Sequence, residues 1–474
     1  MISSRSTHTL PRLVSTLFSR FYLGAVHPWR DRCRETAFRY LSQSQWWSTE
    51  RLESERWQRL HRMLTHAHAN VPLYRDRLTA LGAEPGDIRT PSDFARLPIL
   101  TKADIQEHAA RLRATGGYKA HGTYTNHTGG STGTPLSFRQ DDAYRAWSMA
   151  ELDRDFTMCG YRRGWRQAFL WGSDYDAKAH AGLGGRLRDM ARNLHWVDTF
   201  DLTADTLRRA AAELAAFDPQ LLVGYVSSVT LLAQVIREEG LRGPKPRAIQ
   251  TSAETLTPTA RRLIEDTFGA RCFDRYGCRE VGNLAHECDA HTGLHLLVEN
   301  NYIEFVDDAG EPVAPGEVGH IVATNLRNRA MPLIRYAVGD LGVPSSARCS
   351  CGRGLPMMER VQGRVSDVIV TPAGRLLHGE FFTHLFYGAS GVRQFQVEQR
   401  TLTELDVRMV ADSDVAYETA RARIGDLILR HGDTAFQLTF ARVPHIPARR
   451  SGKYCFTLSH VPVTFRRNSS HALA

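Results

Sequence analysis

The chain has 474 residues, of which 42% are hydrophobic and 23% are charged, and its formal net charge is +9. These are the proportions of an ordinary globular protein, and the length suggests two or more domains. The positive charge is spread along the chain and accompanies no nucleic-acid-binding motif. We therefore expect solvent-exposed arginines and no nucleic-acid partner.

Eight cysteines in a chain of this length do not form a disulfide framework, which favours a reducing compartment. No apolar run reaches transmembrane length. The basic, partly apolar first thirty residues carry no clear cleavage pattern of a signal peptide. The sequence predicts a cytoplasmic protein without a transmembrane segment.

The first part of the chain, to about residue 90, is predicted to be helical. Apolar residues recur at roughly helical spacing between Leu52 and Leu64, behind a plausible helix cap at Ser48–Glu50. Helices are expected over residues 34–81.

The most conspicuous polar segment follows, between two β-prone runs. It comprises Thr128, Gly129, Gly130, Ser131, Thr132, Gly133, Thr134 and Pro135. Glycines allow close backbone approach to a ligand, and successive N–H groups with short hydroxyls suit phosphate oxygens. The segment is not a Walker motif, because no Lys-Ser/Thr pair follows its second glycine.

An α/β pattern comes next. Short apolar runs at 167–171 and 221–225 predict buried strands, with a helix around 207–217 between them. A second helix is expected between Thr257 and Gly269, followed by a strand at 271–273. The pentapeptide 276–280 should then lie beyond the end of that strand, where α/β proteins bind ligands.

Strands dominate after residue 301, and we expect them at 302–306, 319–325 and 333–336. A smaller α+β segment follows residue 363. The predicted fold class is therefore α/β, with a large multi-layer α/β domain over 1–362 and a small α+β domain over 363–474.

Five separated clusters occur in a fixed order. They are the glycine segment, Tyr276-Gly277-Cys278-Arg279-Glu280, Arg335-Tyr336-Ala337-Val338-Gly339-Asp340, Gly363-Arg364-Val365-Ser366-Asp367 and Ser451-Gly452-Lys453. In this order they resemble the AMP-forming, adenylate-forming enzyme superfamily. The Asn70-Val71-Pro72-Leu73-Tyr74 and Cys349-Ser350-Cys351-Gly352-Arg353 segments resemble its phenylacetate–CoA ligase and CapK-like branch.

This resemblance implies an adenylate-forming enzyme fold with a mobile C-terminal lid. It implies a ligase that converts a carboxylic acid and ATP into an acyl-adenylate and pyrophosphate. The acyl group then passes to a thiol, with coenzyme A as the expected acceptor and a carrier's pantetheine as the other possibility. The alternatives are an adenylating enzyme of capsule or exopolysaccharide biosynthesis with another acceptor, and a nucleotide-binding protein without turnover. A homodimer stays open.

The resemblance also assigns roles to residues. The glycine segment resembles the triphosphate cradle, Glu280 the Mg²⁺ ligand, and Asp340 the partner of the ribose hydroxyls. The remaining matches are Ala253, Glu254, Tyr276 and Gly277 beside adenine, Arg364 at ribose or phosphate, Asp367 at the hinge and Lys453 at the α-phosphate. Ala253 replaces a common glycine of the family. Trp171, Tyr225 and Val226 are candidates for lining the acyl pocket.

A zinc site is a further expectation. Cys349 and Cys351 lie in a turn, and Cys288 precedes two histidines, so thiolates and an imidazole could form a tetrahedral structural site. We expect Cys288, His295, Cys349 and Cys351 to be the ligands, with His291 as the rival to His295. Some members of the branch that the chain resembles hold zinc in a matching pattern.

Overall fold

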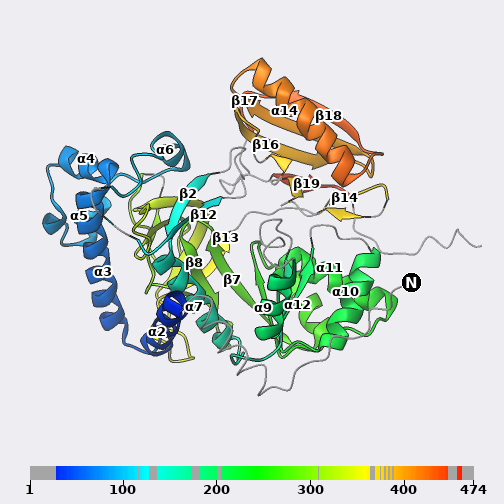
Figure 1. Ribbon diagram of the computed structural model, residues 1–474, viewed down its shortest axis with the longest axis horizontal. Helices are drawn as coiled ribbons and strands as arrows, with labels where there is room; N and C mark the ends of the chain where they lie inside the picture. Colours follow the sequence, from blue (N-terminus) through cyan, green and yellow to red (C-terminus); the bar gives the residue numbers. More distant parts are fainter. Residues whose placement is uncertain are drawn as a thin grey trace, which may run out of the picture.

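The computed structural model describes residues 28–115, 118, 120–127, 136–171, 182–199, 204–307, 309–362, 369–373, 375–377, 381–382, 385–386, 389–446 and 456–461. Within these residues, a large mixed sheet flanked by helices forms the main body, and a smaller sheet unit lies above it (Figure 1). The glycine segment 128–135 and the predicted residues Arg364, Asp367 and Lys453 lie outside the described residues. Nowhere in the described part of the chain is a helix long and apolar enough to cross a membrane.

The helices expected over residues 34–81 are confirmed. The N-terminal elements are α2 (Pro28–Ser44), α3 (Thr49–Asn70), α4 (Pro72–Ala80), η1 (Pro85–Asp87), α5 (Pro91–Ala95) and α6 (Lys102–Glu107). Ser48 caps α3 through its side chain, and Leu52, Leu60, Met63 and Leu64 form its buried stripe. α3 to α6 cover the antiparallel half of the large sheet, and Figure 1 shows them in blue at the left, whereas α2 packs on α7 (Asp142–Met158).

The large sheet has eleven strands. In spatial order they are β10 (Asn301–Val306), β11 (Gly319–Asn325), β12 (Tyr336–Ser345), β13 (Met357–Gln362), β9 (Leu294–Leu296), β8 (Gly282–Glu287), β7 (Arg271–Cys278), β6 (Ala248–Ser252), β5 (Leu221–Tyr225), β3 (Gln167–Trp171) and β4 (Leu194–Asp198). The strands from β4 to β7 are parallel, and the others are antiparallel to their neighbours.

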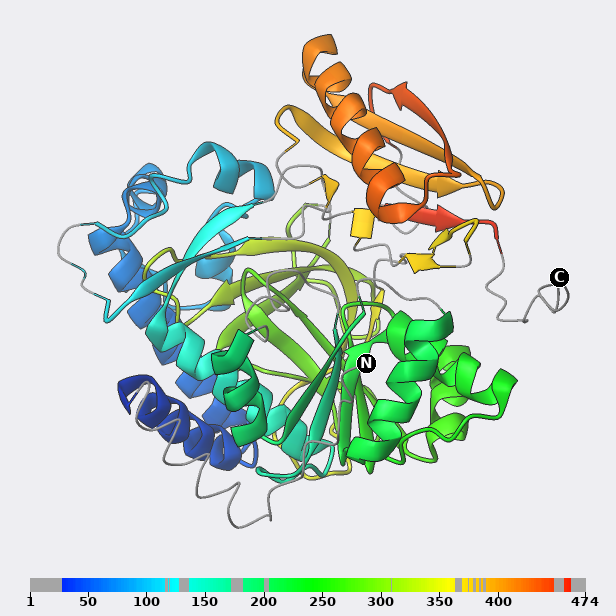
Figure 2. The same cartoon turned by 45° about the vertical axis from the view of Figure 1, so that its right-hand side comes forward.

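The parallel half is covered by α10 (Ala204–Phe217), α11 (Val226–Glu239) and α12 (Pro258–Phe268), seen in green in Figures 1 and 2. β5 is buried along its whole length, as an inner parallel strand should be. Thr257 caps α12, Pro258 begins it, and Gly269 ends it with φ +65°. The predictions for β3, β5, β11, α10 and α12 are confirmed, whereas α11 was not predicted. The remaining helices are α7 (Asp142–Met158) and α9 (Gly182–Ala191).

Two strand predictions need correction. β7 extends to Cys278 rather than ending at 273, because it pairs with β8 through an irregular register at Tyr276 and Gly277. No strand covers 333–336, since β12 begins only at Tyr336. The backbone of 332–334 hydrogen-bonds to the Tyr74 hydroxyl instead, and Arg335 has φ +51°, which interrupts an extended chain.

After residue 369 the chain forms a separate four-stranded sheet of order β18 (Gln437–Arg442), β17 (Glu404–Ala411), β16 (Val392–Gln399) and β19 (Thr457–Ser459). The helix α14 (Asp414–Leu427), which continues into the short helix η2 (Ile428–Gly432), packs on this sheet around its own aromatic core. A small pair, β14 (Ile369–Val370) and β15 (Leu376–Leu377), lies between the two units (Figure 2). The boundary at residue 363 stays a prediction.

Arg335 joins the N-terminal helices to the large sheet. Its side chain is 2% exposed, donates hydrogen bonds to the carbonyls of Ala95 and Leu97, and pairs with Glu304 at 3.1 Å. Its own carbonyl accepts from Leu100, so backbone and side chain together hold the 95–100 segment against the start of β12. These contacts fix the start of β12, the strand that carries Asp340.

We expect Arg335→Met to lower the free energy of unfolding by about 3 kcal/mol, because it leaves the mostly buried Glu304 carboxylate without its cation. Denaturant unfolding would measure the change. Arg360→Met is the matched control, because Arg360 pairs with Glu359 on the exposed surface, where such pairs contribute less than about 1 kcal/mol. Equal stability of the two variants would contradict the proposed anchoring.

Candidate functional site

The parallel strands end along one edge of the sheet, and the predicted site residues follow these ends. β3 ends at Trp171, β5 at Tyr225 and β6 at Ser252, and Tyr225 is the register partner of Ser252. The rings of Trp171 and Tyr225 lie against each other with centroids 4.3 Å apart. The structure thus brings together the two aromatic residues expected at the acyl pocket, and Val226 begins α11 beside them.

The segment predicted to lie along adenine leaves this edge in a fixed conformation. Ala253 has φ +71°, which is uncommon for a residue with a side chain and fits the glycine that the family has there. On one side, the Arg275 guanidinium donates to Ser252 Oγ at 3.0 and 3.2 Å. On the other side, Glu254 accepts a 2.6 Å hydrogen bond from the backbone N–H of Ser227, in the first turn of α11. The anchors on both sides hold the strained alanine in place.

Glu280 and Asp340 are brought into one region by two hydrogen bonds. The Tyr276 hydroxyl donates to Asp340 Oδ2 at 3.0 Å, and the Tyr336 hydroxyl donates to Glu280 Oε1 at 2.9 Å. Both carboxylate residues are half-buried. Burial, with the nearby Glu280 charge, raises the pKa of the Cys278 thiol, so this neighbour stays uncharged.

Gly277 lies at the irregular pairing of β7 with β8. A Cβ at this position would lie 2.6 Å from the Gly282 carbonyl oxygen and 3.0 Å from Asn283 Cα. These are backbone atoms that cannot rotate away. Only glycine therefore fits between Tyr276 and the turn that carries Glu280.

The residues on both sides of the glycine segment form two paired strands. β1 (Thr123–His127) and β2 (Ser137–Asp141) form an antiparallel hairpin around it. Gln140 of β2 accepts from Asn126 at 3.1 Å and donates to the carbonyls of Arg279 and Glu280 at 3.0 and 3.4 Å. The strands that flank the glycine segment in sequence are thereby tied to the backbone that carries Glu280.

The predicted zinc ligands form a separate cluster. One ligand atom from each of Cys288, His295, Cys349 and Cys351 lies within 4.8 Å of all the others. The sulfurs of Cys288 and Cys349 are 3.5 Å apart, and Cys351 Sγ is 3.4 Å from His295 Nε2. The rival His291 lies instead beside Arg261 and Glu287.

Three residues that contact the candidate site were missed by the sequence analysis as individual contributors: Gln140, Arg275 and Tyr336. Arg275 directly precedes the 276–280 cluster and Tyr336 lies within the 335–340 cluster, so their positions in the sequence could have suggested them. Gln140 carries no sequence signal, because it is one polar residue in a short strand.

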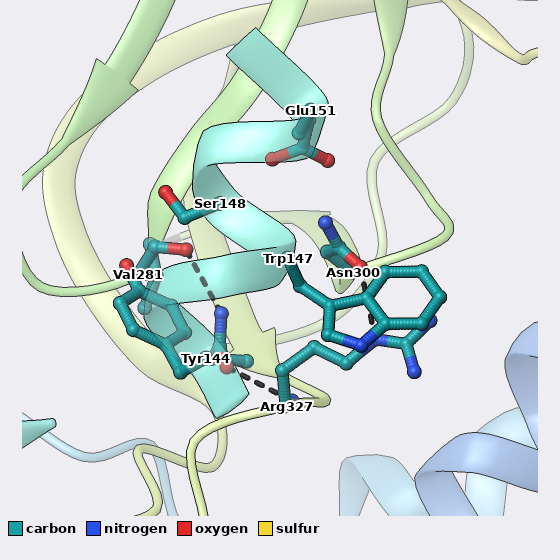
Figure 3. Close-up of a pocket in the computed structure, with 8 residues that line it drawn as sticks. Tyr144, Trp147, Ser148, Glu151, Val281, Asn300 and Arg327 are labelled. Carbon is teal, nitrogen blue, oxygen red and sulfur yellow. Dashed lines mark hydrogen bonds between the residues drawn. The ribbon is translucent and has the colours of Figure 1, made fainter. Parts of the chain in front are cut away.

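A small hollow lies next to Val281, the residue that follows Glu280 (Figure 3). It is lined by Tyr144, Trp147, Ser148, Glu151, Val281, Asn300, Asn325 and Arg327. Asn325 donates a hydrogen bond to the Val281 carbonyl. Figure 3 shows the hydrogen bond from Arg327 to Asn300. None of the residues predicted to bind nucleotide lines it, and the guanidinium of Arg327 lies 3.3 Å over the Trp147 ring. We interpret this hollow as a packing gap behind the site.

The chain is similar in sequence to known proteins. Residues 369–460 match the CapK C-terminal domain. The chain is 28% identical over 352 residues to the phenylacetate-coenzyme A ligase of Escherichia coli, covering 68% of this chain and 73% of the relative. It is 25% identical over 358 residues to the enzyme of the same name from Thermus thermophilus, covering 68% and 72%.

Solved structures share the fold. A 2-hydroxyisobutyryl-CoA ligase in complex with 2-HIB-AMP and CoA, in the thioesterification state, superposes with a TM-score of 0.59 at 21% identity, covering 86% of this chain and 90% of that chain. The same ligase in the postadenylation state gives a TM-score of 0.57, with 88% and 93% covered. By sequence, the chain is similar to phenylacetate-coenzyme A ligases and, over residues 369–460, to the CapK C-terminal domain, and it shares its fold with 2-hydroxyisobutyryl-CoA ligase.

Proposed function

We propose that the protein is an AMP-forming ligase. It converts a carboxylic acid and ATP into an acyl-adenylate and pyrophosphate, and transfers the acyl group to the thiol of coenzyme A. The observation that carries the proposal is the meeting of Glu280 and Asp340 through Tyr336 and Tyr276, beside the anchored 252–254 segment. The relatives named phenylacetate-coenzyme A ligase support the same reaction class.

Each described residue has a defined task in this proposal. Asp340, held by Tyr276, accepts the ribose hydroxyls, and the Tyr276 ring stacks on adenine against the 252–254 backbone. The Glu280 carboxylate fits a Mg²⁺ ion, because Tyr336 engages Oε1 and no described residue donates a hydrogen bond to Oε2. Bound Mg²⁺ neutralises polyphosphate charge, which phosphoryl-transfer enzymes require.

The rest of the machinery is proposed on the resemblance. The glycine segment cradles the polyphosphate, and the hairpin of β1 and β2 ties both of its flanks to the Glu280 turn. Residues 363–474 act as a lid that turns at Asp367, with Arg364 contacting ribose or phosphate. Lys453 reaches the α-phosphate, where a compact ammonium can contact two crowded oxygens.

A second candidate function keeps the adenylation step but transfers the acyl group to a different acceptor. The match of residues 369–460 to the CapK C-terminal domain favours keeping an acceptor other than coenzyme A, as in capsule or exopolysaccharide biosynthesis. Thioester formation with coenzyme A, measured over a panel of aryl and alkyl carboxylic acids, separates the two. Adenylate without thioester would favour the second candidate.

We expect Lys453→Ala to lower carboxylate-dependent exchange of labelled pyrophosphate into ATP by at least about 100-fold, because the mutation removes a cation aimed at transition-state charge. Nucleotide binding should persist, since Asp340 and Tyr276 are untouched. Lys245→Ala, which removes an exposed lysine next to β6, is the matched control. Wild-type exchange in Lys453→Ala would refute the role, and the lack of any exchange in the wild type would refute adenylation.

We further propose a structural zinc ion at Cys288, His295, Cys349 and Cys351. A tetrahedral ion with Zn–S bonds of about 2.3 Å separates its sulfur ligands by about 3.8 Å, close to the observed 3.5 Å between Cys288 and Cys349. Burial lowers the pKa of His295 to about 4, so its imidazole is neutral, as a metal ligand must be. The ion would join the turn after β8 to the loop before β13.

Purified protein should contain about one zinc per chain by elemental analysis, and Cys349→Ser should lose it with a lower melting temperature, because a structural metal stabilises the folded state. Cys33→Ser, at a half-buried cysteine of α2, should keep both the zinc and the stability. Metal-free, fully stable wild-type protein with freely titrating thiols would end this proposal.

A further inference from the structure

Two tyrosine–carboxylate hydrogen bonds link the last part of β7 and the turn after it to the first part of β12. Tyr276 lies four residues before Glu280 and donates to Asp340, whereas Tyr336 lies four residues before Asp340 and donates to Glu280. Each segment therefore supplies one carboxylate and the tyrosine that holds the other. Tyr276 already has a proposed contact with nucleotide, but Tyr336 has none.

Tyr336 is a rigid donor. Its side chain is 2% exposed, and its backbone begins β12 directly after the anchored Arg335. The neighbouring Ala337 N–H donates to the Leu100 carbonyl, which fixes the strand on its other side. A hydroxyl held in this way restricts the Glu280 carboxylate to one orientation at no further entropic cost on binding.

The backbone of Glu280 is held independently. Gln140 is 1% exposed, and its amide donates to the carbonyls of Arg279 and Glu280. Its oxygen accepts from Asn126, on the partner strand of the hairpin that flanks the glycine segment. Main chain and side chain of Glu280 are thus fixed from two different elements.

Resting on the function proposed above, we propose that Tyr336 is the positioning residue of Glu280. By engaging Oε1, it presents Oε2 to the divalent cation that accompanies ATP. Gln140 serves the same end by fixing the Glu280 backbone relative to the hairpin of β1 and β2. Neither residue touches the substrate, and their effect is therefore on metal-dependent nucleotide binding.

The test is calorimetric binding of a non-hydrolysable ATP analogue to the full chain, with and without Mg²⁺. In the wild type we expect Mg²⁺ to tighten binding, and in Tyr336→Phe this gain should shrink about tenfold, the usual cost of losing a hydrogen bond to a charged group. Binding of AMP without Mg²⁺ should be unchanged, because Asp340 and Tyr276 remain. If Tyr336 had a purely structural role, the Tyr336→Phe variant would bind both the ATP analogue and AMP more weakly.

The control is Tyr161→Phe, which removes a 2.9 Å hydrogen bond from a buried tyrosine to the Trp165 carbonyl, away from the site. It should keep the full gain from Mg²⁺. If Tyr336→Phe does not fold, Gln140→Met provides the second variant, with similar volume and no amide donors, and the same loss is expected.

An unchanged gain from Mg²⁺ in a folded Tyr336→Phe or Gln140→Met protein overturns the positioning role and leaves the proposed function intact. A wild type that binds neither the analogue nor AMP overturns both.

Discussion

The hydrogen bond from Tyr276 to Asp340 is the contact on which the site depends. It joins two residues 64 positions apart in sequence and links β7 to β12, two strands that are not neighbours in the sheet. The reciprocal bond from Tyr336 to Glu280 makes the two segments one unit. The nearby Gly277 cannot take a side chain without meeting the backbone of β8, so sterics and hydrogen bonding fix the same turn.

The residues of the candidate site come from both halves of the large sheet. The parallel half presents strand ends with Trp171, Tyr225 and Ser252, a place where α/β proteins bind ligands. The antiparallel half supplies Asp340, held in place by Arg335 and the N-terminal helices. A nucleotide between the two halves would contact both, which explains why residues so far apart in sequence serve one proposed reaction.

Local patterns predicted much of this fold. The continuous apolar runs of β3 and β5 and the cap, proline and glycine of α12 are signals that each element carries in itself. The strand expected at 333–336 failed because Tyr74 and Thr324 side chains, remote in sequence, satisfy its backbone and Arg335 adopts φ +51°. β7 was predicted too short because its last residues are held by pairing with β8.

The residues of the candidate site also fall into two groups, those that sequence patterns predict and those that only tertiary contacts reveal. Glu280, Asp340 and Tyr276 were predicted from ordered clusters, and their roles stay predictions, whereas the part of Gln140 depends on contacts that only the folded chain creates. The central claim is tested most directly by a crystal structure of the full chain with AMP. The account predicts ribose hydroxyls on Asp340 and adenine between Tyr276 and the 252–254 segment. AMP bound elsewhere, with Tyr276 and Asp340 away from it, would contradict the account.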